Sequence, residues 1–260
     1  MFESADLDHK IDKAAFKKEE PKLREALLNA QYDLLRERKF ATLIVIAGVD
    51  GAGKGETVNL LNEWMDPRHI EVTGFPPPTD EERERPPLWR FWRALPPKGK
   101  IGVFFGAWHT EPIVKHVAGE FDEAVFAQRI SEILRFEKML VDEGVLLLKF
   151  WFHLSKAQQK KRLKELEKNP RMHWLVTKAD WKLYDQYDDY VKVCEPFLRK
   201  TSTGEAPWLI VPGADDRYRS LVVGREILDA FSGRLSGKSP KGPPKGGPPP
   251  VPIINNLNVI

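Results

Sequence analysis

The chain has 260 residues, of which 42% are hydrophobic and 30% are charged. These proportions are typical of a soluble globular protein, with enough residues for one sizeable α/β core or two small ones. The formal net charge of +3 is only mildly basic and gives no reason to expect a nucleic-acid partner. A single cysteine, Cys194, excludes an internal disulfide and suits a reducing compartment.

The first residues are charged throughout and lack an apolar core, so they do not resemble a signal peptide. No apolar run approaches the roughly 18 residues that a membrane-spanning helix needs. We therefore expect a cytoplasmic protein without a membrane partner.

Residues 1–40 are expected to form a helical arm. Apolar residues recur there at the spacing of one helix face, namely Leu23, Leu27, Ala30 and Leu34. Pro21 is placed in the first turn of this helix, where its missing N–H group costs nothing.

The most informative stretch runs from Thr42 to Leu61 and reads TLIVIAGVDGAGKGETVNLL. Its apolar run predicts a strand, a glycine-rich loop follows, and a helical pattern comes next. From Gly48 to Lys54 the loop fits G-x-x-x-x-G-K, the Walker A motif of phosphate-binding P-loops. The alternative is an ordinary glycine-rich turn between a strand and a helix.

Each residue type in this loop suits phosphate. Gly51 and Gly53 allow a tight turn that points successive backbone N–H groups at an anion. The helix that follows adds the positive end of its dipole, and Lys54 supplies a mobile positive charge. The predicted phosphate-binding residues are Gly51, Ala52, Gly53, Lys54, Gly55 and Glu56.

Gly55 departs from the usual P-loop, in which a Ser or Thr follows the lysine and binds Mg²⁺. Any metal must therefore be held by carboxylates, and Asp50 inside the loop is the candidate ligand. Alternatively, the Asp50 side chain hydrogen-bonds the backbone of its own loop.

The rest of the chain alternates strands with helices. Strands are predicted at 70–75, 101–108, 145–154 and 208–211, with a polar loop at 79–85, a short helix at 88–95 and a long amphipathic helix ending at Gly144. Capping boxes begin at Ser155 and Thr177. Asp215 is expected to cap a final helix that ends near Phe231. This alternation predicts a parallel sheet with helices on both faces.

Three segments follow from this pattern: the arm at 1–40, a P-loop domain at 41–233, and a linker at 234–260. The linker is rich in Pro and Gly and has no acidic residue from Ser236 onward. Because residues 253–260 are too few for a domain, we expect the chain to come from a longer protein.

Several segments, in the same order, resemble the polyphosphate kinase 2 family. The loop from Gly48 to Glu56 is similar to that family's Gly-x-Asp-Ala-Ala-Gly-Lys-Gly-Gly. The other matching segments are Thr79-Asp80-Glu81-Glu82 with Trp89-Arg90, Leu95-Pro96 before Gly99, KFWFHLSKAQQKKR from Lys149, Tyr184 to Tyr190, and Ala206-Pro207-Trp208 with Val211-Pro212. The chain looks most like the N-terminal half of the two-module members, which are polyphosphate:AMP phosphotransferases.

The resemblance implies a P-loop kinase-like fold related to thymidylate kinases, a three-layer α/β sandwich with a central parallel sheet and a helical lid around 155–180. It implies phosphoryl transfer from polyphosphate to AMP, giving ADP, with Mg²⁺ between the substrates. Lys54 would steady the transferred group, and Asp50 would orient Mg²⁺ or the acceptor. We also expect a homo-oligomer and a second kinase module after the linker.

Two segments depart from the family pattern. After its third strand the family usually reads Phe-Asp-Arg-Ser-Trp-Tyr, whereas this chain has Phe105 in place of the metal-binding carboxylate and Gly106 in place of the arginine. In the lid, the family has Asp-Pro-x-Lys-x-Trp-Lys, and here Met172 and Leu175 replace the two basic residues.

These losses remove charge neutralisation from a phosphoryl-transfer site, where one arginine is worth on the order of 10³ in rate. The sequence therefore predicts a catalytically weakened N-terminal half with a phosphate-binding or structural role. A carboxylate elsewhere, Glu111 or Asp142, is one way to compensate. The alternatives are a fully active polyphosphate-dependent nucleotide kinase and an ATP-dependent nucleoside monophosphate kinase.

Basic residues outside the loop are further candidates. Dense phosphate attracts clustered Lys and Arg, and the candidate polyphosphate contacts are Arg90, Lys161, Arg162 and Arg171. The alternative is a solvated helix face, because acidic residues interrupt the basic run.

Overall fold

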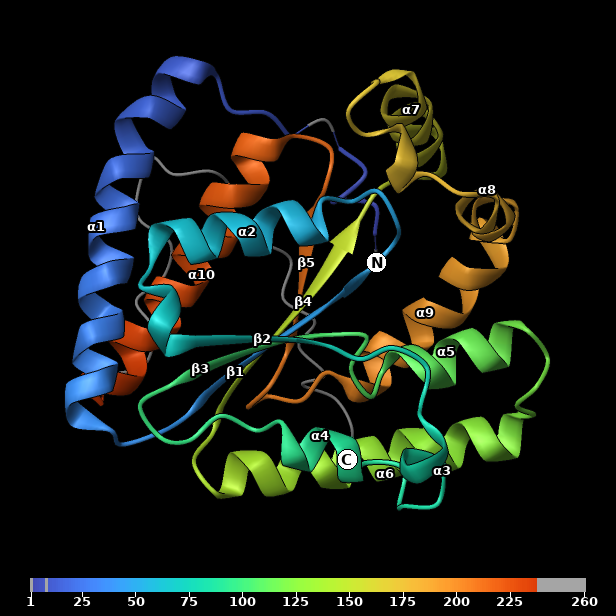
Figure 1. Cartoon of the computed structure of the whole chain (residues 1–260), viewed down its shortest axis with the longest axis horizontal. Helices are drawn as coiled ribbons and strands as arrows, with labels where there is room; N and C mark the ends of the chain where they lie inside the picture. Colours follow the sequence, from blue (N-terminus) through green and yellow to red (C-terminus); the bar gives the residue numbers. More distant parts are fainter. Residues whose placement is uncertain (1, 8, 238–260) are drawn as a thin grey trace.

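The computed structural model describes residues 2–7 and 9–237, which build a five-stranded parallel sheet with helices on both faces (Figure 1). The strands are β1 (Thr42–Gly48), β2 (Ile70–Gly74), β3 (Ile101–Phe105), β4 (Leu146–His153) and β5 (Trp208–Pro212). Their spatial order is β2-β3-β1-β4-β5, so β1 lies at the centre. The predicted α/β sandwich is confirmed, whereas most of the predicted linker lies outside the described residues.

Two groups of helices cover the sheet. On one face the core includes α1 (Lys13–Glu37), α2 (Lys54–Trp64) and α10 (Asp216–Ser236). On the other face it includes α4 (Trp89–Arg93), α5 (Thr110–Val117), α6 (Glu123–Asp142) and α9 (Tyr187–Thr201). Beyond the carboxyl ends of the strands lie α7 (Lys156–Lys168) and α8 (Lys178–Asp185) (Figure 1). Within the described ranges, no helix is long and apolar enough to span a membrane.

The central strand shows why the apolar runs became buried strands. Side chains of β1 alternate between the two cores, with Ile44 and Ile46 on the side of α2 and α10. Leu43 and Val45 enter the core on the side of α5 and α6. Because both faces of the strand are covered, every position in it must be apolar, which produces a continuous run rather than an alternating pattern.

The third strand ends earlier than predicted. β3 stops at Phe105 rather than Trp108, because Gly106 adopts a φ of +61° and turns the chain out of the sheet. The residues that follow form α5, which the sequence analysis did not predict. With eight residues, α5 is too short to show a clear helical periodicity.

The predicted polar loop at 79–85 contains one helical turn, α3 (Asp80–Arg83). A capping box closes this turn, because the Thr79 hydroxyl accepts from the N–H group of Glu82 while the Glu82 carboxylate accepts from the N–H group of Thr79. The capping boxes predicted at Ser155 and Thr177 are confirmed.

The N-terminal helix begins before its predicted start. Asp12 caps α1 by accepting from two backbone N–H groups at 2.9 Å, so Pro21 lies inside the helix and not in its first turn. The predicted apolar face of this helix is buried. At the other end of the chain, α10 starts at the Asp215 cap as predicted and continues to Ser236, past the expected end near Phe231.

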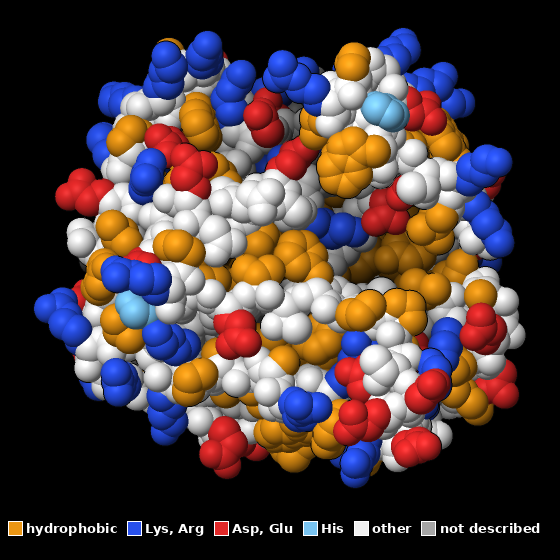
Figure 2. Space-filling view, in the orientation of Figure 1, with side chains coloured by type: hydrophobic (Ala, Val, Ile, Leu, Met, Phe, Trp, Pro, Cys, Tyr) orange, Lys and Arg blue, Asp and Glu red, His pale blue; other side chains and the backbone are white. Residues whose placement is uncertain are grey.

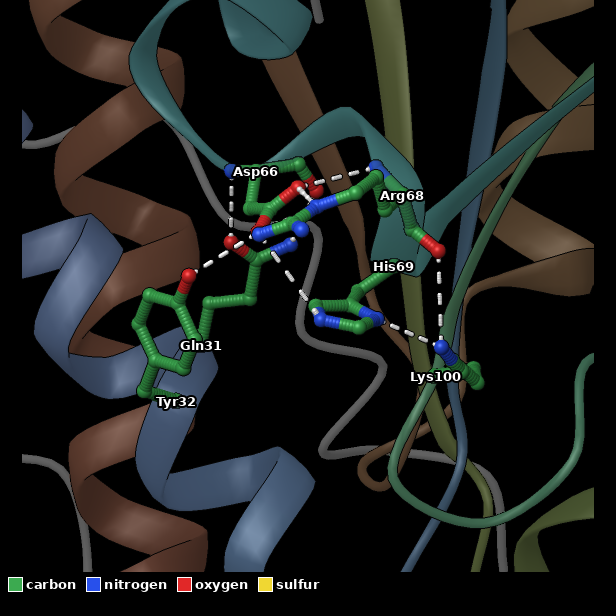
Figure 3. A network of polar contacts seen from close by, with 6 residues as sticks. All are labelled: Gln31, Tyr32, Asp66, Arg68, His69 and Lys100. Carbon is green, nitrogen blue, oxygen red and sulfur yellow. Dashed lines mark hydrogen bonds and ion pairs between the residues drawn. The ribbon is translucent and has the colours of Figure 1, made fainter.

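A buried amide fastens α1 to the end of α2 (Figure 3). Gln31 Nε2 donates to the carbonyl oxygen of Asp66 at 2.9 Å, and the N–H group of Asp66 donates to Gln31 Oε1 at 2.8 Å. The Asp66 carboxylate also accepts from Tyr32 and Arg68, and the bonds from Arg68 hold its pKa well below the usual range. This contact attaches the long arm to the helix that leaves the P-loop.

The substitution Q31A should test this contact between α1 and Asp66. It leaves the buried N–H group of Asp66 without a partner and removes one of the two hydrogen bonds that the Asp66 carbonyl oxygen accepts, the other coming from the N–H group of His69. We expect it to lower the free energy of unfolding by about 2 kcal/mol, measured by urea denaturation. The matched control is Q128A on α6, whose exposed amide bonds Glu132 at 2.9 Å, with an expected change of about 0.5 kcal/mol or less. Equal losses in the two variants would contradict the assignment.

Candidate functional site

The P-loop joins the carboxyl end of β1 to the amino end of α2. Gly51 and Gly53 adopt φ values of +79° and +82°, the left-handed region that allows the tight turn. Gly48 permits a close approach of two strands, since a Cβ there would lie 2.1 Å from the carbonyl oxygen of Phe152. The first turn of α2 therefore starts at the edge of the sheet where anions bind to helix N-termini.

Lys54 and Asp50 meet at this loop. Lys54 Nζ donates to the Gly48 carbonyl oxygen at 2.7 Å and to Asp50 Oδ1 at 3.0 Å. Their side chains are 24% and 41% exposed, so both charged groups are accessible to a ligand. In the described part of the chain, the Asp50 carboxylate therefore bonds Lys54 and not the backbone of its own loop, which was the alternative.

On one side the loop opens into a cavity of about 330 Å³. The predicted catalytic residues share it with the first of the two segments that depart from the family pattern and with aromatic side chains: Asp50, Lys54, Phe105, Gly106, Trp151, Tyr187 and Tyr190. Figure 2 shows a hollow between α5 and the helices α8 and α9, with hydrophobic side chains on its floor. The cavity thus combines a charged rim with an apolar interior.

Phe105 and Gly106 differ in how firmly the fold requires them. The Phe105 side chain is partly buried and packs against the core that contains α2. At Gly106, a Cβ would lie 2.9 Å from the carbonyl oxygen of Phe75, and the φ of +61° is strained for any other residue. An arginine at position 106 would therefore require a different backbone conformation between β3 and α5.

Asp50 is the sole carboxylate among the described residues lining this cavity. The same residues contain no group of three His, Cys, Asp or Glu placed to hold a metal. Mg²⁺ commonly uses one or two carboxylates together with phosphate oxygens and water, so Asp50 fits a Mg²⁺ that arrives with phosphate. The proposed substitutes do not line the cavity, because Glu111 bonds Lys115 at 2.7 Å and Asp142 bonds Lys138 at 2.8 Å elsewhere.

On its other side the loop borders a cleft of about 450 Å³ beneath α7. Lys161 and Arg162 line this cleft, and Met172 occupies part of its wall. Glu56, a predicted phosphate-binding residue, directs its carboxylate to the guanidinium groups of Arg162 and Arg219, the latter at 2.7 Å. Its backbone remains in the first turn of α2, whereas its side chain brings a negative charge to the cleft.

The remaining candidates lie away from the loop. Arg90 donates to the Pro76 carbonyl oxygen at 2.9 Å and pairs with Glu82 at 3.4 Å, in a separate cavity of about 530 Å³. Arg171 and Leu175 are exposed on the segment between α7 and α8. Of the four basic candidates, the structure therefore brings Lys161 and Arg162 to the P-loop cleft.

A buried charged network that the sequence analysis did not predict supports the cavity wall. Lys149 Nζ donates to Glu137 Oε2 and to the Thr201 carbonyl oxygen, both at 2.6 Å. His109 Nε2 donates to Glu137 Oε1 at 2.6 Å, and burial lowers the pKa of His109 so that its ring stays neutral. His109 also lines the cavity. A single lysine within the apolar strand of β4 is the sequence signal for such a buried partner.

Acid should weaken this network. Burial disfavours the charge on Glu137, but the nearby Lys149 and His109 outweigh burial and lower its pKa from 4.5 to about 2. The stability that this ionisation adds is complete above pH 4.5 and is lost as the pH falls toward 2. The loss should reach about 3 kcal/mol. The measurement is urea denaturation across this pH range.

The double variant E137L/K149M serves as the control for this prediction, since replacing both charges avoids an unpaired buried ion. Its free energy of unfolding should depend less on pH over the same range. An identical pH dependence in the two proteins would show that Glu137 does not titrate as described.

A Walker A loop at the carboxyl end of a central parallel strand, followed by a helix, defines a P-loop protein with a kinase-like fold. The family model of Polyphosphate kinase 2 (PPK2) matches residues 10–238, and the chain belongs to this family. The family expected from the sequence motifs is thus confirmed.

Known relatives agree with this assignment. A polyphosphate:AMP phosphotransferase of Pseudomonas aeruginosa is 52% identical over 258 residues, which cover 99% of this chain and 51% of that protein. An AMP/ADP-polyphosphate phosphotransferase of Meiothermus ruber is 32% identical over 213 residues, 80% of each protein. A crystal structure of polyphosphate kinase 2 from Arthrobacter aurescens has a TM-score of 0.83 at 32% identity, covering 86% of this chain and 81% of that one.

The chain spans about half the length of the Pseudomonas aeruginosa relative and about half that of a similar protein from Pseudomonas syringae. The narrower expectation, a weakened N-terminal module followed by a second kinase module, is not supported by the comparisons. The related proteins are named for phosphotransfer itself, which agrees better with the active enzyme that the sequence analysis kept as an alternative.

Proposed function

We propose that the protein transfers a phosphoryl group from polyphosphate to AMP and so forms ADP. The observation that carries this proposal is the meeting of Lys54 and Asp50 at a Walker A loop with a cavity on each side. The names of two relatives, polyphosphate:AMP phosphotransferase and AMP/ADP-polyphosphate phosphotransferase, support these substrates. In-line phosphoryl transfer mainly requires two aligned substrates and neutralised charge between them.

Each group at the loop has a part in this transfer. The backbone N–H groups of residues 51–55 and the N-terminus of α2 bind phosphate oxygens. Lys54 exchanges the neutral Gly48 carbonyl for a charged phosphate oxygen, which makes a stronger hydrogen bond. Asp50 is the residue that would hold Mg²⁺ together with the phosphates, and the ion would supply positive charge to neutralise the transferred group.

We place polyphosphate in the cleft beneath α7 and AMP in the cavity beside Phe105. The cleft offers Lys161 and Arg162 and continues toward the exposed lysines of α7, whereas the cavity has aromatic side chains on which a nucleobase can stack. Asp50 and Lys54 line the cavity, and the next loop residue, Gly51, lines the cleft. The P-loop thus stands between the donor and the acceptor, which is the position from which both phosphates can be reached.

A phosphate-binding half with little turnover of its own is the second candidate function. Phe105 and Gly106 favour it, because they add no charge to a cavity in which Asp50 is the sole carboxylate among the described lining residues. The names of the relatives favour the active enzyme. An ATP-dependent nucleoside monophosphate kinase lacks comparable support, because these relatives are named for polyphosphate.

The variant K54M keeps the length of the side chain but removes its charge. We expect polyphosphate to bind about tenfold more weakly and ADP formation from AMP to slow by about a hundredfold or more. Titration calorimetry and an ADP assay provide the two readouts. The control K138M removes an exposed lysine of α6 and should match the wild type, while unchanged binding by K54M would place the phosphate site elsewhere.

The variant F105D separates the two candidate functions. If the chain turns over slowly, an added carboxylate in the cavity that Asp50 also lines should raise the rate of ADP formation about tenfold or more by helping to hold Mg²⁺. F105N is the matched control, because it makes the same change in size without the charge. Gly106 is left unchanged, since any side chain there meets Phe75.

A wild-type rate within the usual kinase range of about 1–100 per second, unaffected by F105D, would reject the weakened half. A much lower rate that F105D raises and F105N does not would favour it. Absence of ADP formation in every variant, with polyphosphate still bound, would reject the transferase proposal for this chain.

A further inference from the structure

Among the acidic side chains that line the cleft beneath α7, Glu56 pairs with two arginines. Glu56 lies in the first turn of α2, and its carboxylate bridges the guanidinium groups of Arg162 and Arg219. The Glu56 side chain is 42% exposed and lines the cleft, so its charge is presented to any ligand there. The ion pair therefore occupies space and charge that an anion would use.

The two arginines are held differently. Arg219 is almost fully buried, and besides Glu56 it donates to the Gly213 carbonyl oxygen at 2.8 Å and to a threonine hydroxyl at 3.1 Å. Arg162 is 32% exposed, and Glu56 is its ion-pair partner among the described residues. The Arg162 side chain crosses the P-loop, with its Cγ 3.4 Å from the position of a Cβ on Gly51. Arg162 is thus the arginine that can turn from Glu56 to a bound phosphate.

The net charge that a ligand meets depends on how far the ligand extends beyond the cleft. Basic and acidic side chains line the cleft in equal number, so a short anion confined to it meets no net positive charge. Beyond the cleft, α7 exposes further lysines, Lys160, Lys164 and Lys168. Figure 2 shows basic side chains at the outer edge of this region, beside hydrophobic and acidic ones. A longer phosphate chain reaches these lysines, and each phosphate that is neutralised adds affinity.

We propose that Glu56 is a specificity-determining residue that sets the preferred length of the phosphoryl donor. Glu56 holds Arg162 in an ion pair, so a short anion such as tripolyphosphate must compete with a carboxylate for that arginine. A longer polyphosphate binds through the lysines of α7 and leaves the ion pair of Glu56 and Arg162 in place. This inference rests on the proposed function, which places polyphosphate in the cleft.

A purely structural role for Glu56 is the alternative. An acid in the first turn of a helix interacts favourably with the helix dipole, and Glu56 also compensates the buried charge of Arg219. These effects change stability, and they change the binding of short and long donors alike. A residue that selects for donor length changes the affinities for the short and the long donor by different factors. The ratio of the two affinities therefore separates the explanations.

The test is titration calorimetry of the 260-residue chain with tripolyphosphate and with long-chain polyphosphate. E56Q removes the charge but keeps a hydrogen-bonding oxygen, and it should tighten tripolyphosphate about tenfold and long-chain polyphosphate about twofold or less. The matched control is E165Q, which removes another acid of the cleft, one that pairs with Lys161 at 4.0 Å. E165Q should leave the ratio of affinities unchanged.

Arg162 supplies a second test in which Glu56 stays intact. R162Q should leave both donors nearly unchanged, because Glu56 holds Arg162 away from either ligand as long as the ion pair is intact. In the double variant E56Q/R162Q, the gain caused by E56Q should disappear, as expected for two residues that act as a pair. R162Q decides the question even if E56Q is too unstable to titrate.

Equal tightening of both donors by E56Q, a gain that survives R162Q, or a clear weakening of tripolyphosphate by R162Q alone would overturn the proposal. If the wild-type chain binds long polyphosphate but the variants show none of the expected changes in affinity, this inference alone is overturned. A wild-type chain that binds neither donor would overturn the proposed function as well.

Discussion

The contact of the Lys54 ammonium with the Gly48 carbonyl and the Asp50 carboxylate is the interaction on which the site depends. At Gly48, β1 and β4 approach so closely that only glycine fits, and the carbonyl oxygen of this residue accepts from Lys54. Burial on both faces fixes β1, and the Gln31 amide ties α1 to the helix that leaves the loop. The two hydrophobic cores and the contact of Gln31 with Asp66 thus position the Lys54 ammonium group at the edge of the sheet.

Signals that are local in the sequence predicted much of this structure. Continuous apolar runs predicted the strands, glycine spacing predicted the loop, and capping residues predicted several helix starts. The end of β3 was not predicted, because the turn at Gly106 depends on the neighbouring backbone at Phe75. The start of α1 was not predicted either, since Pro21 is a favourable first-turn residue and is found instead inside a helix whose burial compensates for it.

The residues of the site divide in the same way, into those that local sequence signals predict and those whose partners only the fold reveals. The motif identified Asp50 and Lys54 because their contact is made within one loop. The partners of Glu56 come from α7 and α10, more than a hundred residues away, and only the packing of those helices brings them together. The pair of Glu137 and Lys149 is hidden for a similar reason, since a glutamate on an amphipathic helix looks exposed in the sequence. Charge alone therefore indicates candidates, and the fold decides their partners.

A crystal structure of this chain with polyphosphate and Mg²⁺ would test the central claim most directly. The account predicts phosphate oxygens on the N–H groups of residues 51–55, with Lys54 Nζ turned from the Gly48 carbonyl to a phosphate. Ordered polyphosphate bound elsewhere, with Lys54 still on Gly48, would contradict it.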